Sequence, residues 1–445
     1  MKNIAIRPPD WLSKNSVYQI NPRTFSTEGT IHAVTKELPY LKKLGFNVVY
    51  LCPIFAEDDC ADERTWSPRQ LASNTKNPKN MYRMNDYFEI DCEYGKMSDL
   101  KKLVEKAHKL EIKIILDLVY AHIGPNAPII QKHPEFIQQN PDGSFICTQW
   151  KFPALDFRNE GLREYLYCNM LYYISVIDVD GFRCDVGDAV PVDFWKEART
   201  RMQRVKPDAI LINEGFLYEN MTIAFDSCYC FDWHELLRKI YCGDESASSL
   251  KNFSIDLEQK IPYGSKLLRD IDNHDTASDW KERTETVASH DGMEQIEVLN
   301  YLIDGIPMIY AGNEIACEAN HNMFANRFHK GTYEVTDRSK KSTESALRRQ
   351  EVIKTLNKLK SKSDILDFGK TVWLDTSAPD NIIAFKRILG TQEIIFIGNA
   401  KPTPCKIDIS SICNYENTFL FNGEHKIKNS ELLLSPREYV VFTNT

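Results

Sequence analysis

The chain has 445 residues, a formal net charge of −8 and 42% apolar residues, a composition typical of a soluble globular protein with a large core. The mild acidity and the lack of a basic stripe argue against a nucleic-acid partner, and no apolar run is long enough to cross a membrane. We expect no secretory signal, because the first residues contain no long apolar core before a small-residue cleavage site.

Short apolar segments typical of buried strands alternate with amphipathic helical segments through most of the chain. In order, the predicted strands are VYQIN, NVVYLCPIF, KIILDLV, GFRCD, AILINEG, SCYCFD, LLRDIDNHD and PMIYAG, and each precedes a helix or a loop. This alternation predicts a parallel sheet in an α/β fold. Eight such units over about 360 residues favour a closed (β/α)8 TIM barrel over an open sheet.

Two long irregular segments interrupt the pattern, residues 55–80 after the second strand and residues 123–158 after the third. Loops of this length inside a compact domain are usually functional. From residue 371 the sequence changes to alternating strands and turns, which indicates a separate antiparallel β domain.

The twelve cysteines form no CxxC pair, so a zinc site is not expected. Buried free thiols in a cytoplasmic protein are the simpler interpretation of this cysteine content.

Three acids lie at the predicted carboxyl ends of the fourth, fifth and seventh strands: Asp185, Glu214 and Asp275. In a barrel, this end of the sheet is where active sites form. A lone acid at a strand end is more often a cap or a solvated residue. Three of them, with Arg183 and His274 alongside, favour a catalytic site, because cleaving a bond to a sugar requires two carboxyl groups across that bond.

The ordered motifs VYQINPRTF, NVVYLCPIF, NDYFEID, DLVYAH, FPALDFRN, GFRCD, NEG, DNHD and GIPMIYAGNE resemble the α-amylase family of glycoside hydrolases, family 13. The resemblance spans nearly the whole chain. It implies a catalytic barrel at residues 1–122 and 159–370, a short inserted domain B at 123–158 and a C-terminal antiparallel β-sandwich at 371–445. It also implies retaining hydrolysis of α-glucosidic bonds in oligosaccharides, through a covalent glycosyl-enzyme intermediate.

The resemblance further implies a role for each acid. Asp185 matches the nucleophile, Glu214 the acid/base and Asp275 the residue that stabilises the transition state. Arg183 matches the arginine that positions the nucleophile. Since residues two apart on a strand point to the same face, we expect the Arg183 guanidinium to lower the pKa of Asp185 and keep it anionic.

Four further residues match positions that bind or support the sugar in this family. His122 and His274 match histidines that donate hydrogen bonds to the sugar at the cleaved subsite. Asp117 matches an acid that supports this cluster, and Tyr82 matches the aromatic platform under the sugar ring.

Departures from the family pattern lead to three further expectations. Ala121 replaces the usual Asn before His122, and Asp188-Ala189 replaces a Lys-His pair, so we expect no calcium, no other metal and no cofactor. Arg83 replaces a common Asp, and it would either reach the rim of the pocket or form a surface ion pair with Asp86 or Glu89. In the acidic loop, Trp66 would either stack on a sugar or fix its own loop. The run AEDDCADE could bind an ion loosely, but a solvated acidic run is the simpler interpretation.

Other functions remain open at this stage. A transglycosylase or sugar isomerase would use the same scaffold and intermediate, with a sugar in place of water as the acceptor. A non-catalytic carbohydrate-binding relative is a third possibility, although such relatives lose members of the acid triad. The expected partner is an α-linked oligosaccharide, with no nucleic acid and no membrane.

Overall fold

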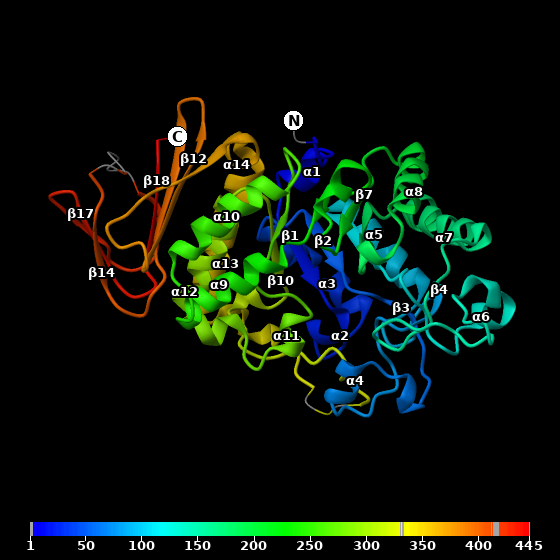
Figure 1. The fold of residues 1–445 in the computed structure, drawn as a ribbon. Helices are drawn as coiled ribbons and strands as arrows, with labels where there is room; N and C mark the ends of the chain where they lie inside the picture. Colours follow the sequence, from blue (N-terminus) through cyan, green and yellow to red (C-terminus); the bar gives the residue numbers. More distant parts are fainter. Residues whose placement is uncertain (1–2, 330, 332, 411, 413–417, 445) are drawn as a thin grey trace.

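The computed structural model describes residues 3–329, 331, 333–410, 412 and 418–444. Eight parallel strands form one sheet in the order β8-β7-β6-β5-β2-β1-β10-β9 (Figure 1). The edge strands meet through a parallel bridge between Cys228 and Leu267, which closes the sheet into a barrel. The predicted fold class is confirmed. The barrel strands are β1 (Val17–Ile20), β2 (Val48–Leu51), β5 (Lys113–Leu118), β6 (Gly181–Cys184), β7 (Ile210–Asn213), β8 (Ser227–Cys228), β9 (Leu268–Arg269) and β10 (Ile306–Tyr310).

Alternate residues of these strands belong to two different cores. Val17, Val48 and Ile115 join a cluster that fills the barrel, whereas the neighbouring Tyr18 and Val49 join a larger cluster beneath the helices. Successive side chains of a strand point to opposite faces, so both faces of the sheet are buried. This explains why the barrel strands read as nearly continuous apolar runs.

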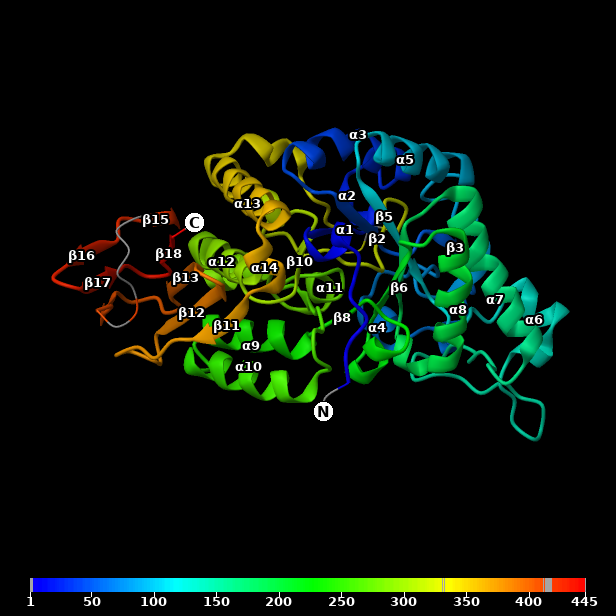
Figure 2. The same ribbon diagram turned by 90° about the horizontal axis from the view of Figure 1, so that it is seen from above.

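Helices surround the barrel on its outside (Figure 2). The longer ones are α3 (Ile31–Lys43), α5 (Met97–Lys109), α7 (Glu160–Tyr172), α8 (Val192–Val205), α9 (Phe231–Cys242), α10 (Ser248–Lys260), α12 (Thr284–Leu302) and α13 (Glu344–Lys362). Short helices are α1 (Asp10–Ser13), α2 (Pro22–Phe25), α4 (Pro68–Ala72), α6 (Pro128–Lys132), α11 (Thr276–Asp279) and α14 (Asp364–Phe368). Of these, α2, α4 and α11 lie at the end of the barrel where the strands finish, opposite α1 (Figure 1).

The two irregular segments are built on small pieces of sheet near that end. The segment 55–80 starts in β3 (Phe55–Glu57), which pairs antiparallel with β4 (Met84–Ile90). The segment 123–158 is folded by isolated antiparallel bridges, including His122 to Ala154 and Cys147 to Pro153.

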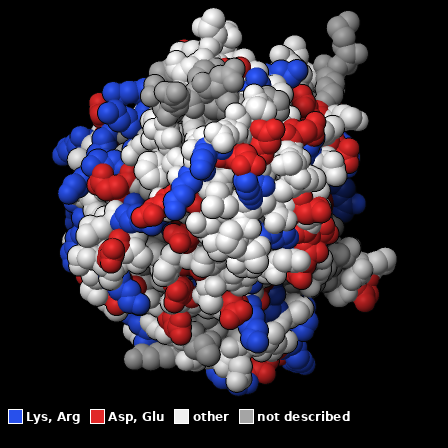
Figure 3. All heavy atoms as spheres, turned by 90° about the vertical axis from the view of Figure 1, so that its left-hand side faces the viewer, with Lys and Arg blue, Asp and Glu red and all other residues white. Residues whose placement is uncertain are grey.

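The C-terminal region contains two antiparallel sheets with a core of their own. It packs on the barrel through α12, where the side-chain amide of Gln295 donates to the carbonyl of Glu438 at 2.9 Å. Acidic and basic side chains are both scattered over the face that this region presents (Figure 3). The strands are β11 (Lys370–Trp373), β12 (Ile382–Leu389), β13 (Gln392–Asn399), β14 (Cys405–Asp408), β15 (Thr418–Phe421), β16 (Lys426–Lys428), β17 (Glu431–Leu434) and β18 (Tyr439–Thr443). Within the described residues, we find no helix with the length and apolar character that a membrane span requires.

Candidate active site

The three strand-end acids meet at one end of the barrel, in one hollow. Asp185 directly follows β6 and Glu214 directly follows β7, while Asp275 lies between β9 and α11. All three line one hollow. Parallel strands present their carboxyl ends on the same side of the barrel. Residues that are far apart in the sequence but follow neighbouring strands therefore lie close together.

Arg183 is the centre of this cluster and is almost fully buried. One guanidinium nitrogen, Nη1, donates to Asp117 Oδ1 at 2.8 Å and to Asp185 Oδ1 at 2.9 Å. The other, Nη2, lies 2.6 Å from Glu214 Oε1. A single cation therefore touches three carboxyl groups, which hold more negative charge than it can neutralise.

This imbalance corrects one of our expectations. Arg183 contacts Asp185 as predicted and does lower its pKa, but burial and the neighbouring charge of Glu214 outweigh it, so the pKa of Asp185 is raised. Burial likewise raises the pKa of Asp117 to about 6, against the opposing effect of Arg183. The cluster therefore holds a proton more tightly than free carboxyl groups do, and it titrates as a unit.

His274 and Tyr82 form the floor beside this cluster. Their rings stack with centroids 5.5 Å apart, and the Tyr82 hydroxyl contacts His274 Nε2. Gln19, on β1, accepts from the backbone N–H of His274 and donates to its Nδ1 at 2.9 Å, which leaves the ring proton on Nε2. Burial lowers the pKa of His274 to about 4, so the ring is neutral at neutral pH. The sequence interpretation missed Gln19, which lies within the motif VYQIN.

His122 lies on the wall formed by the segment 123–158. It packs against the rings of Trp150 and Phe152 at centroid distances of 5.4 and 5.0 Å. Its Nε2 donates to the carbonyl of Tyr82 at 2.9 Å, and its buried Nδ1 has no hydrogen-bond partner among the described residues. Burial lowers the pKa of His122 to about 4.

The backbone after Asp185 is strained in a way that serves Glu214. Val186 has φ 43° and ψ 46°, a left-handed conformation that is costly for a β-branched residue. In this conformation its N–H donates to Glu214 Oε2 at 2.7 Å. A turn that follows one catalytic candidate therefore fixes the carboxylate of the other.

Asp188 holds the loop that follows Glu214. Its carboxylate accepts from the backbone N–H groups of Phe216 and Leu217 at 2.6 and 2.9 Å, and from the side-chain amide of Asn213 at 2.9 Å. In the sequence, Asp188 stood out only as part of a replaced Lys-His pair, so its supporting contacts were missed.

Arg83 fits neither of the expectations for it. It is fully buried rather than at the surface, and it is not among the residues that line the hollow. Its guanidinium donates to backbone carbonyls of the 55–80 segment, including Pro78 at 2.6 Å and Cys60 at 3.0 Å, and lies 3.4 Å from Asp58. Arg83 is thus an internal anchor of that segment.

Trp66 also fixes its own loop. It is 4% exposed, and its indole N–H donates to the Cys60 carbonyl at 2.8 Å. The acidic run around it is only partly solvated, contrary to expectation, because Glu57 and Asp58 are buried beside Arg23 and Arg83. Within the described ranges, no group of three His, Cys, Asp or Glu side chains is arranged to hold a metal ion.

The remaining lining of the hollow comes from two loops. Ser67, Arg69 and Asn80 of the 55–80 segment lie on one side, with Met323 and Phe324 from the loop after β10. Arg69 was not singled out in the sequence, yet it donates to Asp275 Oδ1 at 2.8 Å. The segment 55–80 therefore shapes the hollow, as its length and position predict.

Comparison with known proteins adds the family context. The model of the alpha-amylase catalytic domain matches residues 15–149 and 145–364. A cyclomaltodextrinase of Thermoanaerobacter pseudethanolicus is 26% identical over 71% of this chain and 59% of its own length. An intracellular maltogenic amylase of Bacillus subtilis is 23% identical over 89% of this chain and 70% of its own length. The chain therefore spans about three fifths of the cyclomaltodextrinase it resembles.

A solved structure shows the same fold. The maltogenic alpha-amylase from Thermotoga neapolitana aligns with a TM-score of 0.80 at 24% identity, covering 97% of this chain and 99% of that one.

Proposed function

Because this chain belongs to the alpha-amylase catalytic-domain family, we propose that it is a retaining glycoside hydrolase acting on α-glucosidic bonds in oligosaccharides. The observation that carries the proposal is the shared guanidinium of Arg183, which contacts both Asp185 and Glu214 at neighbouring strand ends. Two carboxyl groups held by one guanidinium lie close together. Retaining enzymes require a short separation between the two carboxyl groups, about 5–5.5 Å, whereas inverting enzymes leave room for a water, so the shared contact supports retention.

In the proposed reaction, Asp185 attacks the anomeric carbon while Glu214 gives its proton to the leaving oxygen. The bond from carbon to the leaving oxygen breaks as the bond from carbon to Asp185 forms. Glu214 then takes a proton from water, and the resulting hydroxide displaces Asp185. The contacts of Arg183 with Asp185 and Glu214 support this cycle, because they hold the two reacting carboxyl groups side by side.

The surrounding side chains would bind the sugar. We propose that Tyr82 is the platform under the ring and that Asp275 binds its hydroxyl groups. His274 is neutral and protonated on Nε2, and because this N–H already contacts the Tyr82 hydroxyl, it would donate to a sugar hydroxyl only by exchanging that partner. We expected His122 to donate a hydrogen bond to the sugar, but its Nε2–H already donates to the backbone carbonyl of Tyr82. Its Nδ1, which has no partner among the described residues, would instead accept a hydrogen bond from the sugar. Asp117 would act through Arg183 and Tyr82.

Similarity to a cyclomaltodextrinase and a maltogenic amylase supports short α-linked glucose chains as substrates. The aromatic wall of Trp150 and Phe152 supports the same substrate class, since sugar rings stack on such side chains. The similarity to an intracellular enzyme supports a cytoplasmic location.

The test is to incubate the purified protein with maltose, maltotriose, cyclomaltodextrins and isomaltose, and to identify the products and their anomeric form. We expect shorter products released with the α configuration. Longer products would indicate a transglycosylase, and isomers a sugar isomerase. No turnover on any sugar, with binding retained, would favour a non-catalytic relative.

A further inference from the structure

Arg69 comes from a loop that is held rigidly at the mouth of the hollow. It lies on α4, where the Ser67 side chain caps the helix by accepting from the N–H of Gln70. The Gln70 amide in turn donates to the carbonyls of Asn77 and Pro78 at 2.9 and 3.2 Å. The backbone that carries Arg69 is therefore fixed from both sides.

The guanidinium of Arg69 holds one side of the Asp275 carboxylate. Nη2 donates to Asp275 Oδ1 at 2.8 Å and to Asp279 Oδ1 at 2.9 Å. On the other side of the same carboxylate, Oδ2 lies 3.4 Å from His274 Nε2. The two oxygens of Asp275 thus have different neighbours, and this fixes the rotation of the carboxylate.

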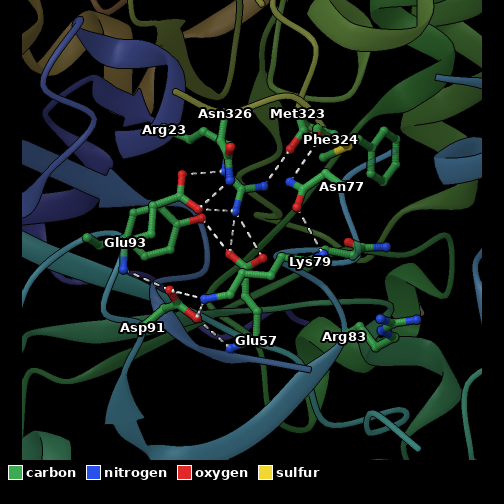
Figure 4. A network of polar contacts seen from close by, with 12 residues as sticks. Arg23, Glu57, Asn77, Lys79, Arg83, Asp91, Glu93, Met323, Phe324 and Asn326 are labelled. Atoms are coloured by element: carbon green, nitrogen blue, oxygen red, sulfur yellow. Dashed lines mark hydrogen bonds and ion pairs between the residues drawn. The ribbon is translucent and has the colours of Figure 1, made fainter. Parts of the chain in front are cut away.

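Met323 and Phe324, which Arg69 contacts, are held in place by a buried polar network (Figure 4). Arg23 lies between Glu57 and Glu93, with contacts of 2.8 and 3.0 Å, and donates to the carbonyl of Met323 at 2.8 Å. The Asn77 amide donates to the carbonyl of Phe324 at 2.9 Å (Figure 4).

Met323 and Phe324 limit where Arg69 can go. Its Nη2 lies 3.4 Å from the sulfur of Met323, and its guanidinium lies over the Phe324 ring at 5.9 Å. A wall of fixed shape on one side and two carboxylates on the other leave little freedom for the Arg69 side chain.

The contact between Arg69 and Asp275 also affects the charge of the Asp275 carboxylate. At neutral pH His274 is uncharged, and Arg183 is shared by Asp117, Asp185 and Glu214. Among the described residues, Arg69 is therefore the cation that contacts Asp275 directly. Burial raises the pKa of Asp275, but the combined effect of His274, Arg69 and Arg183 lowers it below its ordinary value.

We propose that Arg69 is a positioning residue that orients the Asp275 carboxylate for the hydroxyl groups of the bound sugar. The inference rests on the proposed function, because it assigns Asp275 to sugar binding. Arg69 would act by holding Oδ1 and leaving Oδ2 toward the hollow. The Asp279 carboxylate would fix the guanidinium in turn.

The experiment compares four variants with the wild type: Arg69→Ala, Arg69→Lys, Asp279→Asn and, as a matched control, Arg64→Ala. Arg64 lies in the same loop, and its side chain is 90% exposed. Turnover of maltotriose and thermal melting are measured for each. We expect Arg69→Ala to lower kcat/KM by about 10- to 100-fold, because a displaced binding group costs roughly that much. Lysine should restore part of the loss, Asp279→Asn should cause a smaller loss, and Arg64→Ala should leave turnover unchanged.

A double-mutant comparison separates positioning from a general structural effect. Binding of maltotriose is measured by calorimetry in an Asp185→Asn background, with and without Asp275→Asn. Removing Arg69 should weaken binding when Asp275 is present and have little further effect when it is absent. Equal losses in both backgrounds, or wild-type turnover by Arg69→Ala, would overturn the inference. An inactive wild type would instead contradict the proposed function, while the binding comparison would still decide the role of Arg69.

Discussion

At the scale of single residues, the site depends on one guanidinium shared among three carboxyl groups. Arg183 is buried by the strands that carry these acids, so its charge is not screened by water. The arrangement holds Asp185 and Glu214 in fixed orientations and at the same time leaves the cluster with an excess of negative charge. Two carboxyl groups held side by side by one cation are what the proposed retaining mechanism requires.

Replacing Asp185 tests the proposed nucleophile directly. The change Asp185→Asn is nearly isosteric but removes the attacking anion, so turnover should fall by at least about 10³-fold with the melting temperature little changed. The measurement is kcat on maltotriose together with a thermal melt. Asp193→Asn, an exposed acid on α8, is the control and should keep full activity. Near-normal turnover by Asp185→Asn would contradict the assignment.

At the scale of elements, Arg83 ties the 55–80 segment to the barrel. Removing a buried arginine leaves Asp58 as an uncompensated buried charge and several carbonyls without a donor. We expect Arg83→Ala to reduce the free energy of unfolding by about 3–5 kcal/mol. Denaturant melts of Arg83→Ala and of the exposed Arg64→Ala give the comparison. Equal stabilities would show that Arg83 is not an anchor.

The contact between α12 and α13 contains a buried acid, Glu297, which lies 3.3 Å from the guanidinium of Arg349. Burial raises the pKa of Glu297 from 4.5 to about 8, despite the opposing effect of Arg349. The folded protein therefore keeps a proton that the unfolded chain releases between about pH 4.5 and 8, so this residue lowers stability as pH rises through that window.

Glu297→Gln removes that titration. The melting temperature of the variant relative to the wild type should rise between pH 5 and pH 8, because only the wild type carries the stability loss that comes from Glu297. Glu351→Gln, on the exposed face of α13, serves as control and should show no such trend. A difference between Glu297→Gln and wild type that stays constant over this range would contradict the prediction.

At the scale of the whole molecule, the sequence predicts the barrel well and the loop contacts poorly. The strand-end acids could be found because each follows an apolar strand, and strand order places them together. Arg69 and Gln19 could not be assigned in the same way, because their partners Asp275 and His274 lie more than 200 residues away. The burial of Arg83 could not be predicted from the sequence either. Its partners are mostly backbone carbonyls, which every residue type provides.

Metal removal tests the whole molecule. We expect exhaustive chelation to leave both turnover and melting temperature unchanged. Ala121 offers no side-chain oxygen, and the buried charge of Asp58 is met by Arg83 of the chain itself. A fall in either quantity that added calcium reverses would contradict this prediction. Wild-type protein incubated with magnesium after chelation is the control for a nonspecific ionic effect.

The closure of the barrel has a consequence for its motion. Strands β8 and β9 have two residues each, and in the described part of the chain they are joined by the single bridge from Cys228 to Leu267. By contrast, β2 pairs with β5 over four residues. The barrel is therefore closed by one short strand contact. Its backbone amide protons should exchange with solvent first at this contact. Asp275 follows β9, on one side of this bridge, whereas Asp185 and Glu214 follow β6 and β7 on the other side, so the three acids of the hollow come from both sides of the weakest strand contact of the barrel.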